Sequence, residues 1–260
     1  MLHIPALITR RLNLELKELT ISQAVSLASM PLDTGEQETT KFIGFIVDKS
    51  NGLSDPRLMT VQERMLIVAQ YLCAASDDGP DFSIGENAHY SDYLDGAADV
   101  PETDKPVYVA DVEGDKWCVQ PLLGYMAEAI ERLQGELKDN TGAAVSPYVH
   151  WLIGTLSAQL VRENEEIPQE QGKYEEFLIH RMRVFFNYPE SAFAQLLFVW
   201  NEGKKILHHF FNLEIDEVNG GYVVLPKEGA ENSEELPLVK FPVHTCLSPI
   251  AGRMGKNFAR

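Results

Sequence analysis

The residues best suited to bind a metal are the adjacent His208 and His209, together with His244 and Cys246. Imidazole nitrogen and thiolate sulfur are ligands that suit Zn²⁺. Their spacing argues against a shared site, because neighbouring helical residues point in different directions. The one-residue gap between His244 and Cys246 is also shorter than the usual gap between zinc ligands. We therefore expect neither a bound metal nor a cofactor.

Other residues that could act chemically are expected to serve the fold. His150 and His180 occur in segments rich in aliphatic side chains, so we expect hydrogen-bonded residues of the core or its boundary. An aromatic stripe is expected to form core, with some members at a subunit interface; it comprises Phe185, Phe186, Tyr188, Phe193, Phe198, Trp200, Phe210 and Phe211.

Two groups of aspartates could coordinate Ca²⁺, one formed by Asp77, Asp78 and Asp81 and the other by Asp92, Asp95 and Asp99. Neither group follows the alternating oxygen-ligand spacing of a calcium loop, so we expect solvated acids.

Motifs of known catalytic sites are missing from the sequence. It contains no G-x-S-x-G, H-E-x-x-H or G-x-G-x-x-G pattern. The segment Gly252–Asn257 is too short for a phosphate-binding loop and ends in Asn where Ser or Thr is needed. We expect no catalytic residue, and an enzyme whose site leaves no local motif remains the alternative.

Charge and composition limit the class of partner. The 260 residues carry a formal net charge of -17 at pH 7, which argues against nucleic-acid binding and suits a soluble protein. The start of the chain has no basic and apolar leader pattern, and no apolar run approaches the roughly 20 residues that span a bilayer. Cys73, Cys118 and Cys246 are expected to be reduced thiols of a cytoplasmic protein without membrane contact.

Two helix starts stand out in the first quarter of the chain. Alternation of leucine with polar residues over 12–17 predicts a strand. Thr20 with Gln23, and Thr60 with Glu63, have the spacing of a capping box, in which each side chain hydrogen-bonds the other's backbone. Residues 39–47 are expected to form a short helix or a buried strand, and residues 48–55 a turn.

The middle of the chain changes from strands to helices. Residues 105–119 alternate around a central Glu-Gly-Asp and predict a β-hairpin. Helical periodicity predicts helices over 122–138, 146–160, 173–187 and 189–212. Asn219-Gly220 predicts a second hairpin, between strands 213–218 and 222–225.

We therefore predict an α+β fold with four parts. Residues 1–76 form a strand-helix module, residues 77–105 an acidic connection, residues 106–247 a hairpin with a mainly helical domain, and residues 248–260 an extended arm. The arm has three cations and no acid, with apolar residues too sparse for a core, so we expect it to contact another subunit. Its predicted interface residues are Pro249, Ile250, Arg253, Met254, Lys256, Phe258 and Arg260.

The run Leu14–Gln23, followed by Leu58–Arg64, resembles the opening of small tail proteins of double-stranded DNA phages, namely the baseplate hub and tail assembly chaperone groups. This resemblance implies a non-enzymatic structural component of a tail or baseplate, made in the host cytoplasm and held in the virion. Its partners would be other tail or baseplate proteins and further copies of itself. The alternative within the resemblance is an assembly chaperone that leaves the finished particle.

Overall fold

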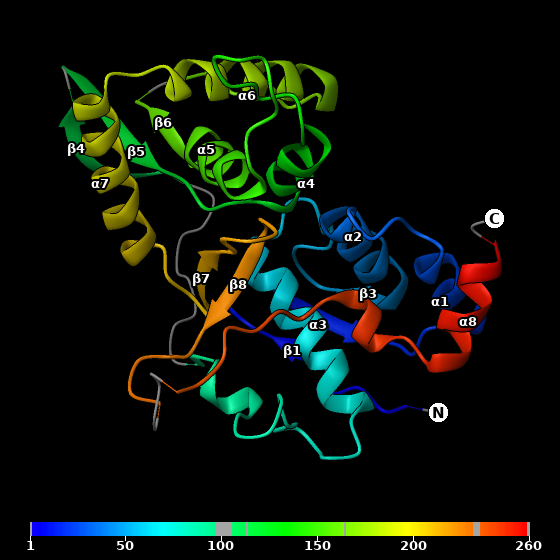
Figure 1. The fold of residues 1–260 in the computed structure, drawn as a ribbon. Helices are drawn as coiled ribbons and strands as arrows, with labels where there is room; N and C mark the ends of the chain where they lie inside the picture. Colours follow the sequence, from blue (N-terminus) through cyan, green and yellow to red (C-terminus); the bar gives the residue numbers. More distant parts are fainter. Residues whose placement is uncertain (1, 97–105, 113, 164, 231–234, 259–260) are drawn as a thin grey trace. The chain divides into compact units, whose positions relative to one another are not determined.

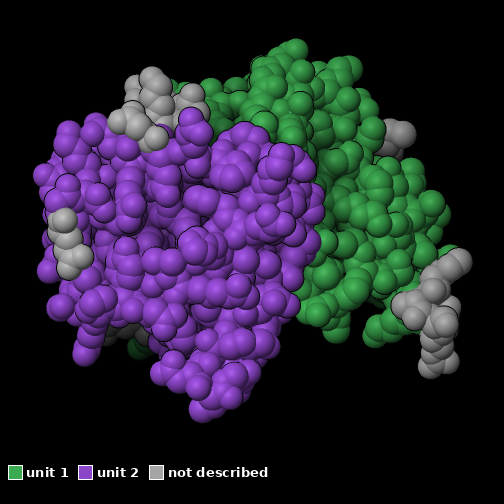
Figure 2. All heavy atoms as spheres, turned by 90° about the horizontal axis from the view of Figure 1, so that it is seen from above, with its two compact units in different colours: residues 1–99, 209–213, 223–260 green, residues 100–208, 214–222 purple. Residues whose placement is uncertain are grey.

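The computed structural model describes residues 2–96, 106–112, 114–163, 165–230 and 235–258. The chain divides into two compact units, which are coloured separately in Figure 2. Unit 1 comprises residues 1–99, 209–213 and 223–260, and unit 2 comprises residues 100–208 and 214–222. The first boundary falls inside the predicted acidic connection 77–105. The predicted domain of residues 106–247 is divided between the units, because residues 209–213 and 223–247 belong to unit 1.

Both units combine helices with small antiparallel sheets, which confirms the α+β class (Figure 1). Unit 1 holds the sheet β1-β2-β3 and the helical elements around it. Its elements are β1 (Leu7–Ile8), β2 (Asn13–Leu16), α1 (Ile21–Ala28), α2 (Gly35–Ile46), β3 (Val47–Ser50), α3 (Val61–Ala75), the 3₁₀ turns η1 (Tyr90–Asp92) and η2 (Val243–Cys246), and α8 (Pro249–Phe258).

The local signals of the N-terminal module form as predicted. Leu12 and Leu14 are buried, while Asn13 and Glu15 between and after them are exposed. Thr20 and Thr60 each cap a helix, α1 and α3 respectively, and both capping boxes are complete. The segment from residue 39 is helical, as part of α2, and residues 47–50 pair with β2 as β3 where a turn was predicted.

Unit 2 contains the predicted β-hairpin and helices. Its hairpin gains a third strand, β6, which pairs with β5. The elements are β4 (Val107–Val112), β5 (Asp115–Val119), α4 (Gly124–Arg132), α5 (Pro147–Gln159), β6 (Leu160–Arg162), α6 (Gln171–Phe186) and α7 (Glu190–Ile206). The Ser146 hydroxyl accepts the Val149 N–H at the start of α5, as the sequence predicts.

Two of these helices end earlier than predicted. Helix α4 stops at Arg132 and α7 at Ile206. After α4, Gly135 takes a φ of 84° that an α-helix does not allow. After α7, Phe210 takes a φ of 53°, and the Phe211 N–H donates to the His209 carbonyl. Such a tight turn is incompatible with continued helix.

The second predicted hairpin is present as β7 (Asn212–Ile215) and β8 (Tyr222–Leu225). Its turn is longer than the two-residue turn expected from Asn219-Gly220. Positive φ falls at Gly220 (69°) and Gly221 (73°). An Asp216 carboxylate oxygen accepts the Val218 N–H at 2.9 Å, which stabilises the first part of the loop.

The prediction of an extended C-terminal arm is wrong, because residues 249–258 form the helix α8 beside α1. Ala251 is fully buried, and a Cβ added to Gly255 would lie 2.5 Å from the Ala28 Cβ of α1. Small side chains thus allow the two helices to approach closely. In the part of the chain that the structure describes, no helix combines the length and apolarity needed to cross a membrane.

Candidate functional site

The four residues considered as metal ligands have different surroundings, and His208 is partly exposed. His209 is buried, with Nε2 2.7 Å from Oγ1 of Thr60, whereas His244 is exposed on η2. The Cys246 thiol is buried, and its desolvation raises the pKa well above its usual value. Among the described residues, no three His, Cys, Asp or Glu side chains gather where they could hold a metal ion.

His209 instead belongs to a buried polar network in unit 1. Thr60 Oγ1 accepts the Glu63 N–H at 3.1 Å, and Glu63 Oε2 accepts the Thr60 N–H at 2.8 Å. The Arg11 guanidinium lies 3.5 Å from the same Glu63 carboxylate, whose side chain is only 2% exposed. This network joins the start of α3 to the β1–β2 loop and to the segment after α7.

His150 and His180, the two histidines expected in the core or at its boundary, differ from each other. His150 is buried, and its Nε2 lies 2.7 Å from the carbonyl oxygen of Ile130. Because a carbonyl only accepts, Nε2 carries the proton. Burial lowers the pKa of His150 more than this hydrogen bond raises it, so the imidazole is neutral at pH 7. His150 is the core residue that was predicted, whereas His180 is exposed.

Two of the aspartates considered as calcium ligands, Asp81 and Asp92, accept hydrogen bonds within the loop after α3. Both Asp81 carboxylate oxygens accept from Ser91, one from its N–H at 2.7 Å and one from its hydroxyl at 2.9 Å. Asp92 accepts the His89 N–H at 2.8 Å. Asp77 and Asp78 are exposed, and Asp99 lies outside the described residues.

The three cysteines are free thiols. Desolvation raises the pKa of Cys73 to about 11 and also raises that of Cys118. A thiol is nucleophilic as the thiolate, so raised pKa values leave these groups poorly reactive near neutral pH.

Several residues of the predicted aromatic stripe are core residues. Phe185, Trp200, Phe210 and Phe211 are buried, and the Trp200 indole N–H donates to Gln159 Oε1 at 2.9 Å. Phe198 is different, because 63% of its surface is exposed on α7. Phe186, Tyr188 and Phe193 are partly exposed.

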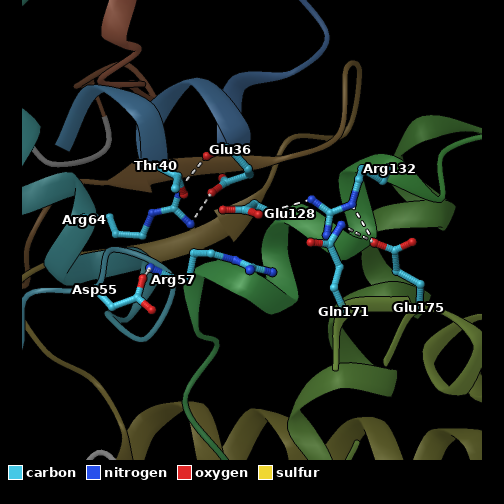
Figure 3. Close-up of polar contacts among 9 residues, drawn as sticks. All are labelled: Glu36, Thr40, Asp55, Arg57, Arg64, Glu128, Arg132, Gln171 and Glu175. Carbon is cyan, nitrogen blue, oxygen red and sulfur yellow. Dashed lines mark hydrogen bonds and ion pairs between the residues drawn. The ribbon is translucent and has the colours of Figure 1, made fainter. Parts of the chain in front are cut away.

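Two arginines, buried Arg64 and partly exposed Arg132, connect elements in ways that the sequence analysis did not anticipate (Figure 3). In unit 1, Arg64 of α3 is buried, and its guanidinium lies 3.2 Å from the Glu36 carboxylate and donates to Thr40 at 3.1 Å, both on α2. The only sign of this contact in the sequence is that Arg64 lies within the apolar run of α3. Buried charge needs a partner, and this one is 28 positions away.

A second tie lies within unit 2 (Figure 3). Arg132 at the end of α4 donates to Glu175 of α6 at 2.7 Å and to Glu128, one turn earlier, at 3.1 Å. Gln171 at the start of α6 also donates to Glu175, at 3.2 Å. Like Arg64, Arg132 neutralises carboxylates that the fold brings out of water, which is a structural use of charge.

A different kind of surface lies on α8, where five of the seven predicted interface residues can be placed. Pro249, Arg253 and Lys256 are exposed. Ile250 and Met254 are 58% and 42% exposed, although both are large and apolar. The Phe258 side chain and Arg260 lie outside the described residues. The helix thus presents apolar and cationic side chains to the surroundings while its small residues face α1.

The chain matches no protein-family model, no curated protein and no solved structure in the comparisons. The candidate site therefore rests on its own geometry.

The polar groups and the surface of α8 differ in their surroundings. The side chains of His150, His209, Arg64 and Arg132 are engaged in hydrogen bonds or ion pairs within their own unit. Those of His180, His244, Asp77 and Asp78 are exposed. The outward face of α8 (Pro249, Ile250, Arg253, Met254 and Lys256) combines exposed apolar area with positive charge, as protein-binding surfaces do. We refer to it as the α8 face.

Proposed function

We propose that the protein is a non-enzymatic structural component of a phage tail or baseplate and that it acts through protein–protein contacts. It would be made in the host cytoplasm and incorporated into the virion. The observation that carries this proposal is the α8 face, because a helix that exposes Ile250 and Met254 leaves apolar area that a partner can bury.

Two further observations support a role in assembly. The N-terminal run with its two capping boxes is the part of the chain that resembles tail and baseplate proteins, and both boxes are complete in the structure. The ion pairs of Arg64 with Glu36 and of Arg132 with Glu175 also connect helices within each unit. A rigid unit loses little conformational entropy when it binds, which favours stable contacts with other subunits.

Quantitative mass spectrometry of purified particles tests the proposal. A structural component is expected at a fixed copy number relative to the other tail proteins, in particles washed free of host protein. An assembly chaperone would instead be abundant in the infected cell and missing from particles. That result would contradict a place in the virion. A catalytic turnover lost on a single substitution, with the fold intact, would contradict the non-enzymatic role.

A further inference from the structure

The α8 face has a charge that contrasts with the rest of the chain. No Asp or Glu follows Glu235 in the sequence, whereas Lys240, Arg253, Lys256 and Arg260 do. The whole chain has a net charge of -17. A partner for this face should therefore be acidic and should also offer apolar contact to Ile250 and Met254.

The loop after α3 has those properties. Asp77, Asp78 and Glu86 are exposed, and within the described parts of the chain their carboxylates form no ion pair. Phe82 and Ile84 of the same loop are partly exposed. We call residues 77–86 the acidic loop. In unit 1 it lies below α3 in Figure 1, apart from α8, so the two surfaces are separate on one chain.

We propose that the α8 face of one chain docks on the acidic loop of a second copy. Contact between two α8 faces would set Lys256 against Lys256, and like charges disfavour that symmetric arrangement. Contact between the α8 face and the acidic loop is reciprocal in a two-fold dimer, or it repeats head-to-tail in a closed ring or an open filament. This inference deepens the proposed function by naming the partner surface.

Two other anionic partners have to be distinguished from a second copy. A nucleic acid would neutralise the cations but would offer little apolar surface to Ile250 and Met254. An anionic membrane offers both kinds of contact, so binding to anionic vesicles in place of self-association would overturn the inference. A second copy supplies carboxylates and partly exposed apolar groups together.

Charge reversal with rescue tests the contact, with association measured by analytical ultracentrifugation of the whole chain at low salt. Lys256→Glu alone and the double variant Asp77→Lys/Asp78→Lys alone should each weaken association by about tenfold or more, because each sets like charges against one another. A chain carrying all three changes should recover association, since the charges are then exchanged across the contact. Higher salt should weaken the wild-type contact.

Two controls separate this contact from general charge effects. Lys138→Glu makes the same charge change on an exposed residue of unit 2 and should leave association unchanged. The double variant lowers the net negative charge, so a general repulsion between chains would make it associate more strongly, opposite to our expectation. Circular dichroism melting of each variant verifies the fold.

Several outcomes would overturn the inference. The first is a wild-type chain that stays monomeric at about 100 μM, a concentration at which even weak interfaces are detected. The others are an equal loss of association with Lys138→Glu and a triple variant whose association does not recover. Each concerns copies of this chain in solution. The particle experiment can succeed while this one fails, so the two proposals can be rejected separately.

Discussion

Thr60 and Thr20 occupy the same position in the same local motif, but their surroundings differ. Thr20 is exposed, and its hydroxyl accepts the Gln23 N–H at 3.3 Å. Thr60 is fully buried, and its hydroxyl contacts both the Glu63 N–H and the His209 ring. The exposed threonine thus caps a helix, whereas the buried threonine caps a helix and also hydrogen-bonds a buried histidine.

We expect Thr60→Ala to lower the free energy of unfolding by about 2–3 kcal/mol, since it removes a helix cap and a hydrogen bond to a buried imidazole. Thr20→Ala should cost about 1 kcal/mol, because only the cap is lost. Urea denaturation measures both. Thr60→Ser keeps the hydroxyl and should retain most of the stability. Equal losses for the two alanine variants would contradict the role assigned to His209.

His150 makes stability depend on pH. Burial lowers the pKa of His150 below its ordinary value of 6.5, so below pH 6.5 the unfolded chain binds a proton that the folded chain does not. Above pH 6.5 this proton does not affect stability. As the pH falls below 6.5, the free energy of unfolding decreases by up to about 1.4 kcal/mol per pH unit.

His150→Gln should therefore flatten the fall in unfolding free energy between pH 7 and 5.5. Denaturant titrations across this range provide the measurement, and His180→Gln, which replaces an exposed imidazole, is the matched control. A slope that is identical in wild type and His150→Gln would disprove the contribution of His150.

Residues differ in how far the sequence predicts their roles. His150 could be assigned to the core because the aliphatic residues around it in α5 are visible locally. The partners of Arg64 and His209 could not be assigned, because Glu36 and Thr60 are brought to them only by tertiary packing. Both partners of a capping box lie within four residues of sequence, whereas the partners of a buried ion pair come together only when the whole unit folds.

At the scale of elements, α8 shows how packing can override weak local preference. Its sequence contains two glycines, which are poor helix formers, so an extended arm was predicted. The start of α8 does carry a local signal, because the Ser248 hydroxyl accepts the Ala251 N–H at 3.2 Å and proline is favourable at the first helical position. The glycines have different surroundings. Gly255 faces Ala28, whereas a Cβ added to Gly252 would meet nothing within 4 Å.

The two glycines provide a matched pair of substitutions. Gly255→Ala should release α8 from α1, because its Cβ would lie 2.7 Å from the Ala28 carbonyl carbon, which is backbone and cannot rotate away. Gly252→Ala should stabilise the helix by about 0.5–1 kcal/mol through higher helix propensity. Hydrogen exchange of residues 249–258 reports both effects. Faster exchange in both variants would argue against the α1–α8 contact.

Other elements follow the same division between local and distant causes. The β4–β5 hairpin and the start of α5 were predictable, because their turn and cap signals lie within a few residues. Strands β3 and β6 were not, because each exists only through pairing with a strand formed elsewhere in the chain. Short strands of this kind have little periodicity of their own to detect.

At the scale of the whole molecule, the acidic composition governs colloidal behaviour. The net charge of -17 at pH 7 opposes non-specific aggregation, and it approaches zero near the isoelectric point of about 4.8. We expect a solubility minimum near that pH, measurable by light scattering during a pH titration. Solubility that rises steadily from pH 7 to 4.8 would refute this expectation.

The division of unit 1 between both ends of the chain affects its synthesis. A ribosome completes residues 1–99 well before it reaches residues 209–260, and at 5–20 residues per second the delay is about 5 to 20 s. During that delay α1 has no α8 to cover Ala28, and Thr60 has no His209. Unit 1 can therefore finish folding only after unit 2 has been translated. A nascent chain interrupted before residue 209 would leave the incomplete core of unit 1 accessible to proteases and chaperones.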